Sequence, residues 1–358
     1  MTALSRRSVL IQATPIMAAN AASPLVGLVD IAVIGRTGTT AEIAAVALGV
    51  LIFNTLFWAF GFLRMGATAL AAQADGANDE AEVRASLLRG SGVGLAAGLV
   101  FVILQTPIRE TAFALFSGSD AAEDAGRAYF DARIWGAPAA LAGFAVYGWL
   151  IGIGRTGWAL ALQAALNLVN VALSIGFVYG LDLGVAGVAA ASAVSQWVML
   201  AAGALIIWRV FAARGRSGMA RLSDAGAVKR LFAVNRDIFL RTLFLLAGIL
   251  WFNEASLREG EAVLAGNAIL LQFISISAYV LDAFAHVTES LAGKAVGSKS
   301  WAQLKRAMRL SSELALAGAA ALSALIWFGG ESFIALMTTD PDARATAQRF
   351  LIWCALAP

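Results

Sequence analysis

The stretch Leu281–Gly297, LDAFAHVTESLAGKAVG, decides the fold because it joins membrane-length hydrophobicity to ionisable side chains. It lies within an apolar segment that is long enough to span a bilayer as a helix. Asp282, His286 and Glu289 are spaced i, i+4 and i+7, so they share one helical face. Ionisable groups at membrane depth are costly, and they therefore indicate function. The last seven residues, LAGKAVG, also echo LAAQADG at 70–76.

The composition predicts an all-α integral membrane protein. The 358 residues are 60% hydrophobic and 14% charged, with a mean hydropathy of +0.77. Soluble domains carry roughly a quarter charged residues. Strands of β-barrels are shorter and alternate in hydrophobicity, so the long apolar runs favour helices. Ten spans are expected, over 10–34, 43–73, 87–106, 128–151, 158–180, 184–212, 230–256, 262–295, 304–329 and 343–358.

The distribution of charge predicts the orientation and excludes several classes of protein. Lys and Arg concentrate in the loops after even-numbered spans, which places the N-terminus in the cytoplasm and the chain in the inner membrane. In a membrane protein the net charge of +3 gives no reason to expect nucleic acid. The GxGxxG pattern at Gly152–Gly157 follows an apolar helix, so it predicts a tight turn and not a nucleotide site. No enzyme motif, resident cofactor or Cys/His metal site is expected.

An internal repeat predicts two pseudo-symmetric bundles. A constant shift of 221 residues aligns LAAQADG (70–76) with LAGKAVG (291–297), and it also pairs Tyr129-Phe130 with Phe350-Leu351. Two parallel copies require an even number of spans in each half, namely six. The expected organisation is a first lobe over 1–213, a cytoplasmic linker over 214–229 and a second lobe over 230–358. That second lobe holds four of six spans, and about 75 further residues would complete it.

Several motifs together resemble the multidrug and toxic-compound extrusion (MATE) family, in its branch similar to DNA-damage-inducible protein F. They are Pro24–Gly35, Gly66–Gly76, Asn235–Thr242, Leu271–Phe273 and the opening stretch. The resemblance implies a monomeric, two-lobed helical bundle that exports small organic compounds across the bilayer in exchange for protons or sodium ions. Alternating access would open a central cavity to each side in turn.

The resemblance also implies an ion-coupling site in the first lobe. Asp30 matches the family's intramembrane acid, and Asn170, Ser174 and Ser192 match the polar positions around it. Ser174 stands where other members often carry a second Asp, which leaves one carboxylate and puts the coupling ion in question. A carboxylate at this depth needs a partner or must take up a proton. The alternative is structural: Asp30 pins the kink near Pro24.

A second candidate set is Asp282, His286 and Glu289 in the second lobe. It is either a proton relay or cation site that faces the cavity, or a hydrogen-bond network that stabilises the lobe. Arg241 is expected to pair with Asp237 one turn earlier, while Arg64 needs a partner from another helix. These residues either line the cavity or form structural ion pairs.

The sequence is therefore compatible with three functions. The first is a secondary-active antiporter for organic compounds, coupled to H⁺ or Na⁺. The second is a flippase for lipid-linked sugars from the same superfamily, which the cationic Arg64 and Arg241 favour. The third is a truncated chain that does not transport.

Overall fold

A computed structural model of the protein describes residues 4–115, 120–214 and 225–358, and every regular element in them is a helix. The helices run as α1 (Arg6–Ala22), α2 (Leu25–Thr37), α3 (Thr40–Trp58), α4 (Phe62–Gly76), α5 (Glu80–Ile103), α6 (Gln105–Leu115), α7 (Asp120–Arg133), α8 (Ala137–Gly152), α9 (Thr156–Ile175), α10 (Gly184–Ala213), α11 (Ala225–Arg258), α12 (Glu261–Gly297), α13 (Trp301–Met337) and α14 (Pro341–Leu356). Two short helical turns complete them, η1 (Ile134–Gly136) and η2 (Gly176–Gly180).

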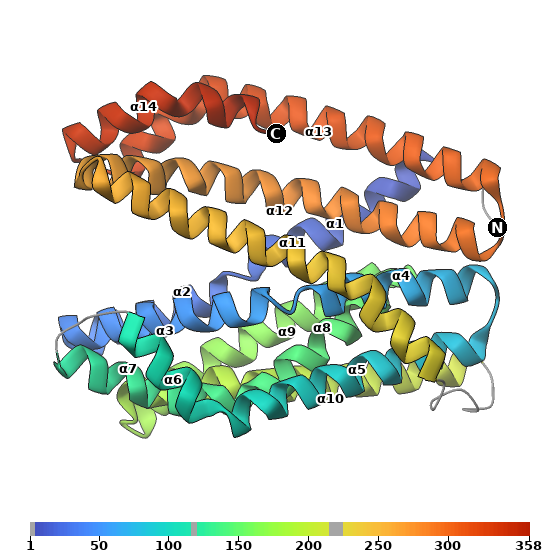
Figure 1. Cartoon of the computed structure of the whole chain (residues 1–358), viewed down its shortest axis with the longest axis horizontal. Coiled ribbons are helices and arrows are strands. Elements are labelled where there is room, and N and C mark those ends of the chain that lie inside the picture. The colour runs from blue at the N-terminus through green and yellow to red at the C-terminus, as the bar shows by residue number, and fades with distance from the viewer. Residues whose placement is uncertain (1–3, 116–119, 215–224) are drawn as a thin grey trace.

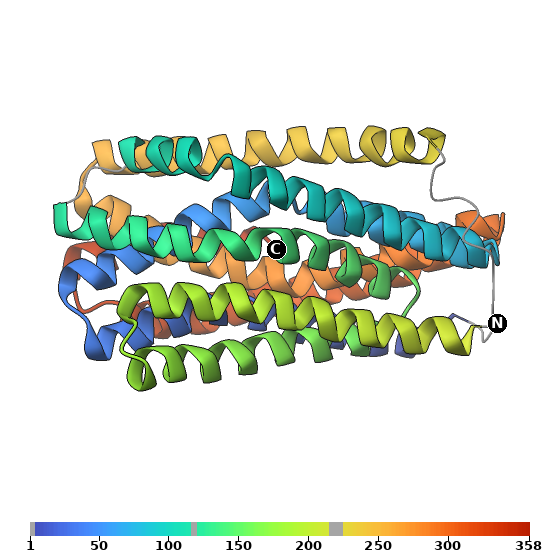
Figure 2. The ribbon, with the colours of Figure 1, turned by 90° about the horizontal axis from the view of Figure 1, so that it is seen from below.

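The helices form two bundles that lie one above the other in Figure 1. The first lobe contains α2–α10, and the second contains α11–α14. Helix α1 runs between them and packs against both α9 and α12. Figure 2 shows that the long helices of both lobes run along the same axis. The predicted linker 214–229 lies mostly outside the described residues, and its last part, 225–229, is the first turn of α11.

The predicted spans are all helical, although three of them, 10–34, 43–73 and 128–151, are each divided between two helices, and two further places differ. Nine helices or helix pairs of the described chain are long and apolar enough to cross a membrane. The predicted tenth span becomes α14, whose 16 residues cover about 24 Å, less than a hydrocarbon core of about 30 Å. Helix α6 forms where the sequence predicted only a loop.

Close backbone contacts confirm the repeat. A β-carbon at Gly76 would overlap the backbone of Lys294, and a β-carbon at Gly297 would overlap the backbone of Gln73. Gln73 and Lys294, like Gly76 and Gly297, are related by the 221-residue shift. The two copies therefore contact each other through equivalent atoms, as expected for an approximate two-fold axis between α4 and α12. Directly beyond them, Asn78 and Lys299, also equivalent, both have positive φ, at 56° and 53°.

The hydrophobic cores show that the two lobes are packed together at one end of the molecule and have separate cores toward the other end. Where α1 begins and α4 and α12 end, one core contains residues of both lobes, with Val9, Trp149 and Leu150 packed together with Phe284 and Val287. We call this the closed end (right in Figure 1). Toward the other end the two lobes have separate cores. One surrounds Phe53, Tyr129 and Phe130 in the first lobe, and the other surrounds Ile269, Phe273 and Ile334 in the second.

Candidate ion-coupling site

Asp30 lies on α2, one and a half turns beyond the break at Pro24, and its side chain is completely buried. The hydroxyl of Tyr129 donates to Asp30 Oδ2 over 2.9 Å, and that of Ser192 donates to the same oxygen over 3.0 Å. Arg133 Nη1 lies 3.7 Å from Oδ2. The side chains that contact the Asp30 carboxylate thus come from other helices: α7, α10 and, for Asn170, α9.

Helix α9 supplies the second layer of the site. Asn170 Nδ2 donates to Ser192 Oγ over 2.8 Å, so Asp30, Ser192 and Asn170 form one chain of hydrogen bonds. Ser174 is one turn further along α9 and is also fully buried. Asn170 Oδ1 and Ser174 Oγ accept or donate no hydrogen bond within the described part of the protein. The structure thus brings Asp30, Ser192 and Asn170 into contact, while Ser174 Oγ has no hydrogen-bond partner among the described residues.

Tyr129 and Arg133 are the two site residues that the sequence reasoning missed. They lie one turn apart on α7, on the face that meets α2 and α3. Arg133 is only 8% exposed, and its guanidinium also lies over the ring of Phe53, 5.7 Å from the centroid. A signal was present, because Arg133 falls inside the predicted span 128–151. Arg64 and Arg241 are selected because they are charged residues inside predicted spans, and the same reason applies to Arg133.

The arrangement suits a carboxylate that changes its charge. Tyr129, Ser192 and Arg133 all present donors, which matches an ionised Asp30. A proton on Asp30 would make it a donor, and Ser192 would have to turn to accept it. The unpartnered Oδ1 of Asn170 is then available to accept from Ser192 once the amide rotates. The described residues hold no cluster of three His, Cys, Asp or Glu side chains that could bind a metal ion.

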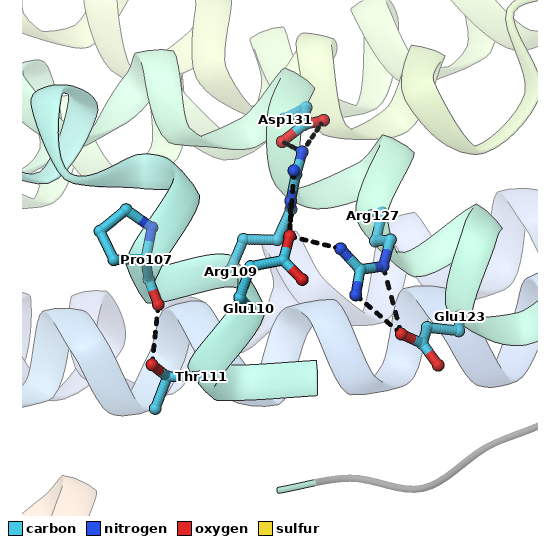
Figure 3. Close-up of polar contacts among 7 residues, drawn as sticks. All are labelled: Pro107, Arg109, Glu110, Thr111, Glu123, Arg127 and Asp131. Atoms are coloured by element: carbon cyan, nitrogen blue, oxygen red, sulfur yellow. Dashed lines mark hydrogen bonds and ion pairs between the residues drawn. The ribbon is translucent and has the colours of Figure 1, made fainter. Parts of the chain in front are cut away.

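An ion-pair network on α6 holds the outer face of α7 (Figure 3). Arg109 Nη1 contacts both carboxylate oxygens of Asp131, at 2.8 and 2.6 Å. Glu110 accepts from Arg127 over 2.6 Å, and Arg127 also pairs with Glu123 over 2.8 Å. Hydrogen bonds from Arg127 and then Arg109 lower the pKa of Glu110. Arg127 and Asp131 alternate along α7 with Tyr129 and Arg133, so the network helps to set the position of the Asp30 site.

The second candidate set is only partly assembled. His286 Nδ1 lies 3.7 Å from Glu289 Oε2, which is too long for a hydrogen bond. His286 Nε2 and Glu289 Oε2 have no hydrogen-bond partner among the described residues, although both atoms are buried. Asp282 is exposed at the start of this face. Arg64 on α4 interacts electrostatically with all three side chains.

The predicted pair between Asp237 and Arg241 is wrong. Asp237 instead pairs with its neighbour Arg236 over 3.1 Å, and both side chains are exposed. Arg236 is the sequence neighbour of Asp237, so its guanidinium reaches the carboxylate directly, whereas Arg241 lies one helical turn away. Arg241 acts electrostatically on Asp282 of α12.

Polar contacts between the lobes gather at the closed end. Asp75 on α4 binds Lys294 of α12 and Arg214 of α10, each over 2.7 Å. Ser290 Oγ lies 3.0 Å from the carbonyl oxygens of both Ile151 and Gly152 on α8. The bonds of Lys294 and Ser290 join α12 directly to α4 and α8, and Asp75 links this contact to Arg214 at the end of α10.

The two lobes and the nine membrane-length helices or helix pairs of the described chain define a multi-pass membrane protein. The family model described as MatE matches residues 15–176 and 238–357, so the chain belongs to the MatE (MATE) family, whose members are transporters and not enzymes. It is 33% identical to "DNA damage-inducible protein F" of Escherichia coli over 97% of this chain and 76% of that protein. It is 23% identical to "Probable multidrug resistance protein NorM" of Acinetobacter baylyi over 91% of this chain and 74% of that protein.

Solved structures agree on the fold. An "Outward-facing conformation of a multidrug resistance MATE family transporter of the MOP superfamily" superposes with a TM-score of 0.86 at 20% identity, over 99% of this chain and 80% of that one. A "Crystal structure of MATE in complex with MaL6" gives 0.84 at 21% identity, over 97% and 77%.

Proposed function

We propose that this protein is a secondary-active antiporter that exports organic compounds and is driven by the entry of protons, with Asp30 as the coupling group. One observation carries the proposal. Asp30 is a completely buried carboxylate that accepts hydrogen bonds from two hydroxyl groups and lies 3.7 Å from the guanidinium of Arg133, beside a chain of hydrogen bonds that can reverse. A group of this kind can bind and release a proton without losing all its partners.

The proximity of Arg133 favours protons over sodium ions. An Na⁺ ion would need oxygen ligands, and Asp30, Ser192, Asn170 and Ser174 offer them. A proton needs only one oxygen of Asp30, whereas Na⁺ needs several oxygen ligands around it. The guanidinium of Arg133, 3.7 Å from Oδ2, already stands beside the single carboxylate, and Ser174 supplies no second acid to bind a metal cation there.

The orientation follows from the charged residues at the closed end. Lys294 and Arg214 both bind Asp75 there, Arg84 bonds to the carbonyl of Phe211, and Lys294 also lies beside Gly154. By the positive-inside rule, these cations support a cytoplasmic location for that end. The N-terminus is then cytoplasmic, and the protein has the conformation that is closed inward. Alternating access requires the shared core and the polar contacts of the closed end to separate once in each transport cycle.

The balance of charge between the lobes argues for export of organic compounds over a lipid-linked-sugar flippase. A flippase site for pyrophosphate would need unbalanced cations. Here Asp282 opposes both Arg64 and Arg241. Transport assays with a fluorescent dye and with a lipid-linked precursor distinguish the two functions.

The test is efflux of a dye from proteoliposomes under an imposed pH gradient. Asp30→Asn should abolish efflux driven by the gradient and leave the protein folded in the membrane, since the amide keeps the size and loses the exchangeable proton. Asp182→Asn is the matched control. Asp182 is exposed and has φ +54°, a conformation that Asn tolerates. Efflux by the Asp30→Asn variant at the wild-type rate would overturn the assignment, and efflux driven by a sodium gradient alone would replace protons by Na⁺.

A further inference from the structure

We propose that His286 and Glu289 form a second proton-binding site, which releases a contact between the lobes when it takes up a proton. This proposal rests on the proposed coupling to protons. The ligand is the proton itself, and the site lies on α12 at the upper edge of the closed end. It involves no residue of the Asp30 site.

The first observation is that the pair is buried and unsatisfied. His286 is 4% exposed, its Nδ1 lies 3.7 Å from Glu289 Oε2, and neither Oε2 nor the histidine's Nε2 has a hydrogen-bond partner in the described chain. A buried polar group without a partner is unfavourable by about 1–3 kcal/mol, and more when charged. A proton is the ligand that fits, because it turns the carboxylate into a neutral carboxyl group whose hydroxyl can donate to the acceptor nitrogen of a neutral imidazole.

The second observation is the position of Arg64. Helices α4 and α12 pack side by side at equivalent positions of the repeat. Ala72 contacts Gly293, which is the residue 221 positions later. Arg64 lies on α4 two turns before that contact, and it interacts electrostatically with Glu289, His286 and Asp282. No ion pair within 4 Å fixes the guanidinium of Arg64 to any described residue. An ionised Glu289 thus attracts a cation of the opposite lobe across the interface.

The remaining helices around α12 add few charges at this level. Helix α11 contributes Arg241, which acts on Asp282, and α8 contributes Tyr147, which also interacts with Arg64. On α13, Arg309 pairs with Glu313, and Glu313 pairs with Arg6 of α1. The ionisable residues of α14 are Asp342 and Arg344 in its first turn and Arg349 beside Phe350. Arg64 is therefore the cation of the first lobe that responds most directly to a change of charge at Glu289.

The two charge states differ in how strongly the lobes attract each other. With Glu289 ionised, the attraction to Arg64 adds to the Asp75–Lys294 pair and to the shared core. A proton bound from the open side neutralises the carboxylate and removes that attraction. The closed end then separates more readily, and the proton is exposed to the opposite side. This order is the one that an antiporter driven by protons requires.

The experiment measures separation of the closed end in proteoliposomes while Asp30 cannot respond. Spin labels on Ala77→Cys and Ala302→Cys, both exposed, report the distance between the lobes in an Asp30→Asn, Cys354→Ala background. Lowering the pH from about 9 to about 5.5 spans the range in which a buried carboxyl group titrates. We expect the widely separated population to increase roughly tenfold, a typical coupling between two sites. Adding Glu289→Gln should produce the wide population at both pH values.

Three further variants make the outcome decisive. Glu289→Asp should keep the pH response, His286→Asn should shift its midpoint, and Arg64→Gln should widen the closed end at neutral pH. Loss of the pH response in Asp30→Asn alone would overturn the second site while supporting Asp30. An unchanged response after Glu289→Gln would also overturn it. Gradient-driven efflux by Asp30→Asn, in contrast, bears on the proposed function alone.

Discussion

Asp75 and Lys294 form a 2.7 Å ion pair directly beside the point where Gly76 meets the backbone of Lys294. The glycine contact is symmetric between the two repeats, and the charges are not. The residue equivalent to Lys294 is Gln73, and the residue equivalent to Asp75 is Val296. The ion pair is thus an asymmetric addition to a symmetric helix crossing, and it joins the lobes at the end that alternating access must open.

Breaking this pair should loosen the closed end. The side chains of Lys294 and Asp75 are 21% and 17% exposed, so screening is only partial. A double-mutant cycle of Asp75→Asn and Lys294→Gln should give a coupling of about 1 kcal/mol, or roughly a fivefold change in the separated population. Cross-linking of cysteines at the closed end measures this population.

The matched control is the exposed pair of Arg258 and Glu254, which joins neighbouring turns of α11. Glu254→Gln should leave cross-linking at the closed end unchanged. Additive effects of Asp75→Asn and Lys294→Gln would mean that the pair contributes nothing to closure.

The glycines of the crossing give a second prediction. Gly76→Ala would place a methyl group against the backbone of Lys294, which cannot move aside as a flexible side chain does. Such overpacking is unfavourable by about 1–3 kcal/mol, and it should favour separation of α4 from α12. Gly92→Ala on α5 is the control, because nothing lies within 4 Å of the added carbon. That substitution should raise the melting temperature slightly, since alanine favours a helix by about 0.5–1 kcal/mol.

The sequence predicted the repeat and Asp30 because both depend on local pattern. The 221-residue shift is visible in the letters, and a buried acid in an apolar run is unusual wherever it occurs. The structure confirms the repeat through the contact of Gly76 with Lys294.

What the sequence could not supply is the set of partners on other helices. Tyr129 is separated from Asp30 by 99 residues, and Ser192 by 162, so no spacing rule joins them. Family resemblance supplied Ser192, while Tyr129 and Arg133 had to come from the geometry. The error at Asp237 has a similar origin, because helical spacing allowed Arg241 as a partner but did not weigh the adjacent Arg236.

The hydrogen bond from Tyr129 to Asp30 gives a third prediction. Tyr129→Phe keeps the ring among Phe53 and Phe130 but removes one donor from a buried carboxylate. The free energy of unfolding should fall by about 1–3 kcal/mol. In the Asp30→Asn background the same change should have a smaller effect, because the amide carries no charge to stabilise. Thermal unfolding in detergent of the two single variants and the double variant measures this difference, and equal effects in both backgrounds would contradict it.

The fourth prediction concerns acid stability at the α6–α7 network. Hydrogen bonds from Arg127 and Arg109 lower the pKa of Glu110 in the folded protein below its ordinary value of 4.5. The stability from this carboxylate is therefore fully present above its unfolded pKa, and it is lost as the pH falls through the folded pKa. Glu110→Gln should lower the melting temperature at neutral pH and reduce the further loss in acid. Glu259→Gln, at an exposed carboxylate, is the control. Because α7 carries Tyr129 and Arg133, the same variant should also weaken gradient-driven efflux, and wild-type efflux together with reduced stability would separate the network from the Asp30 site.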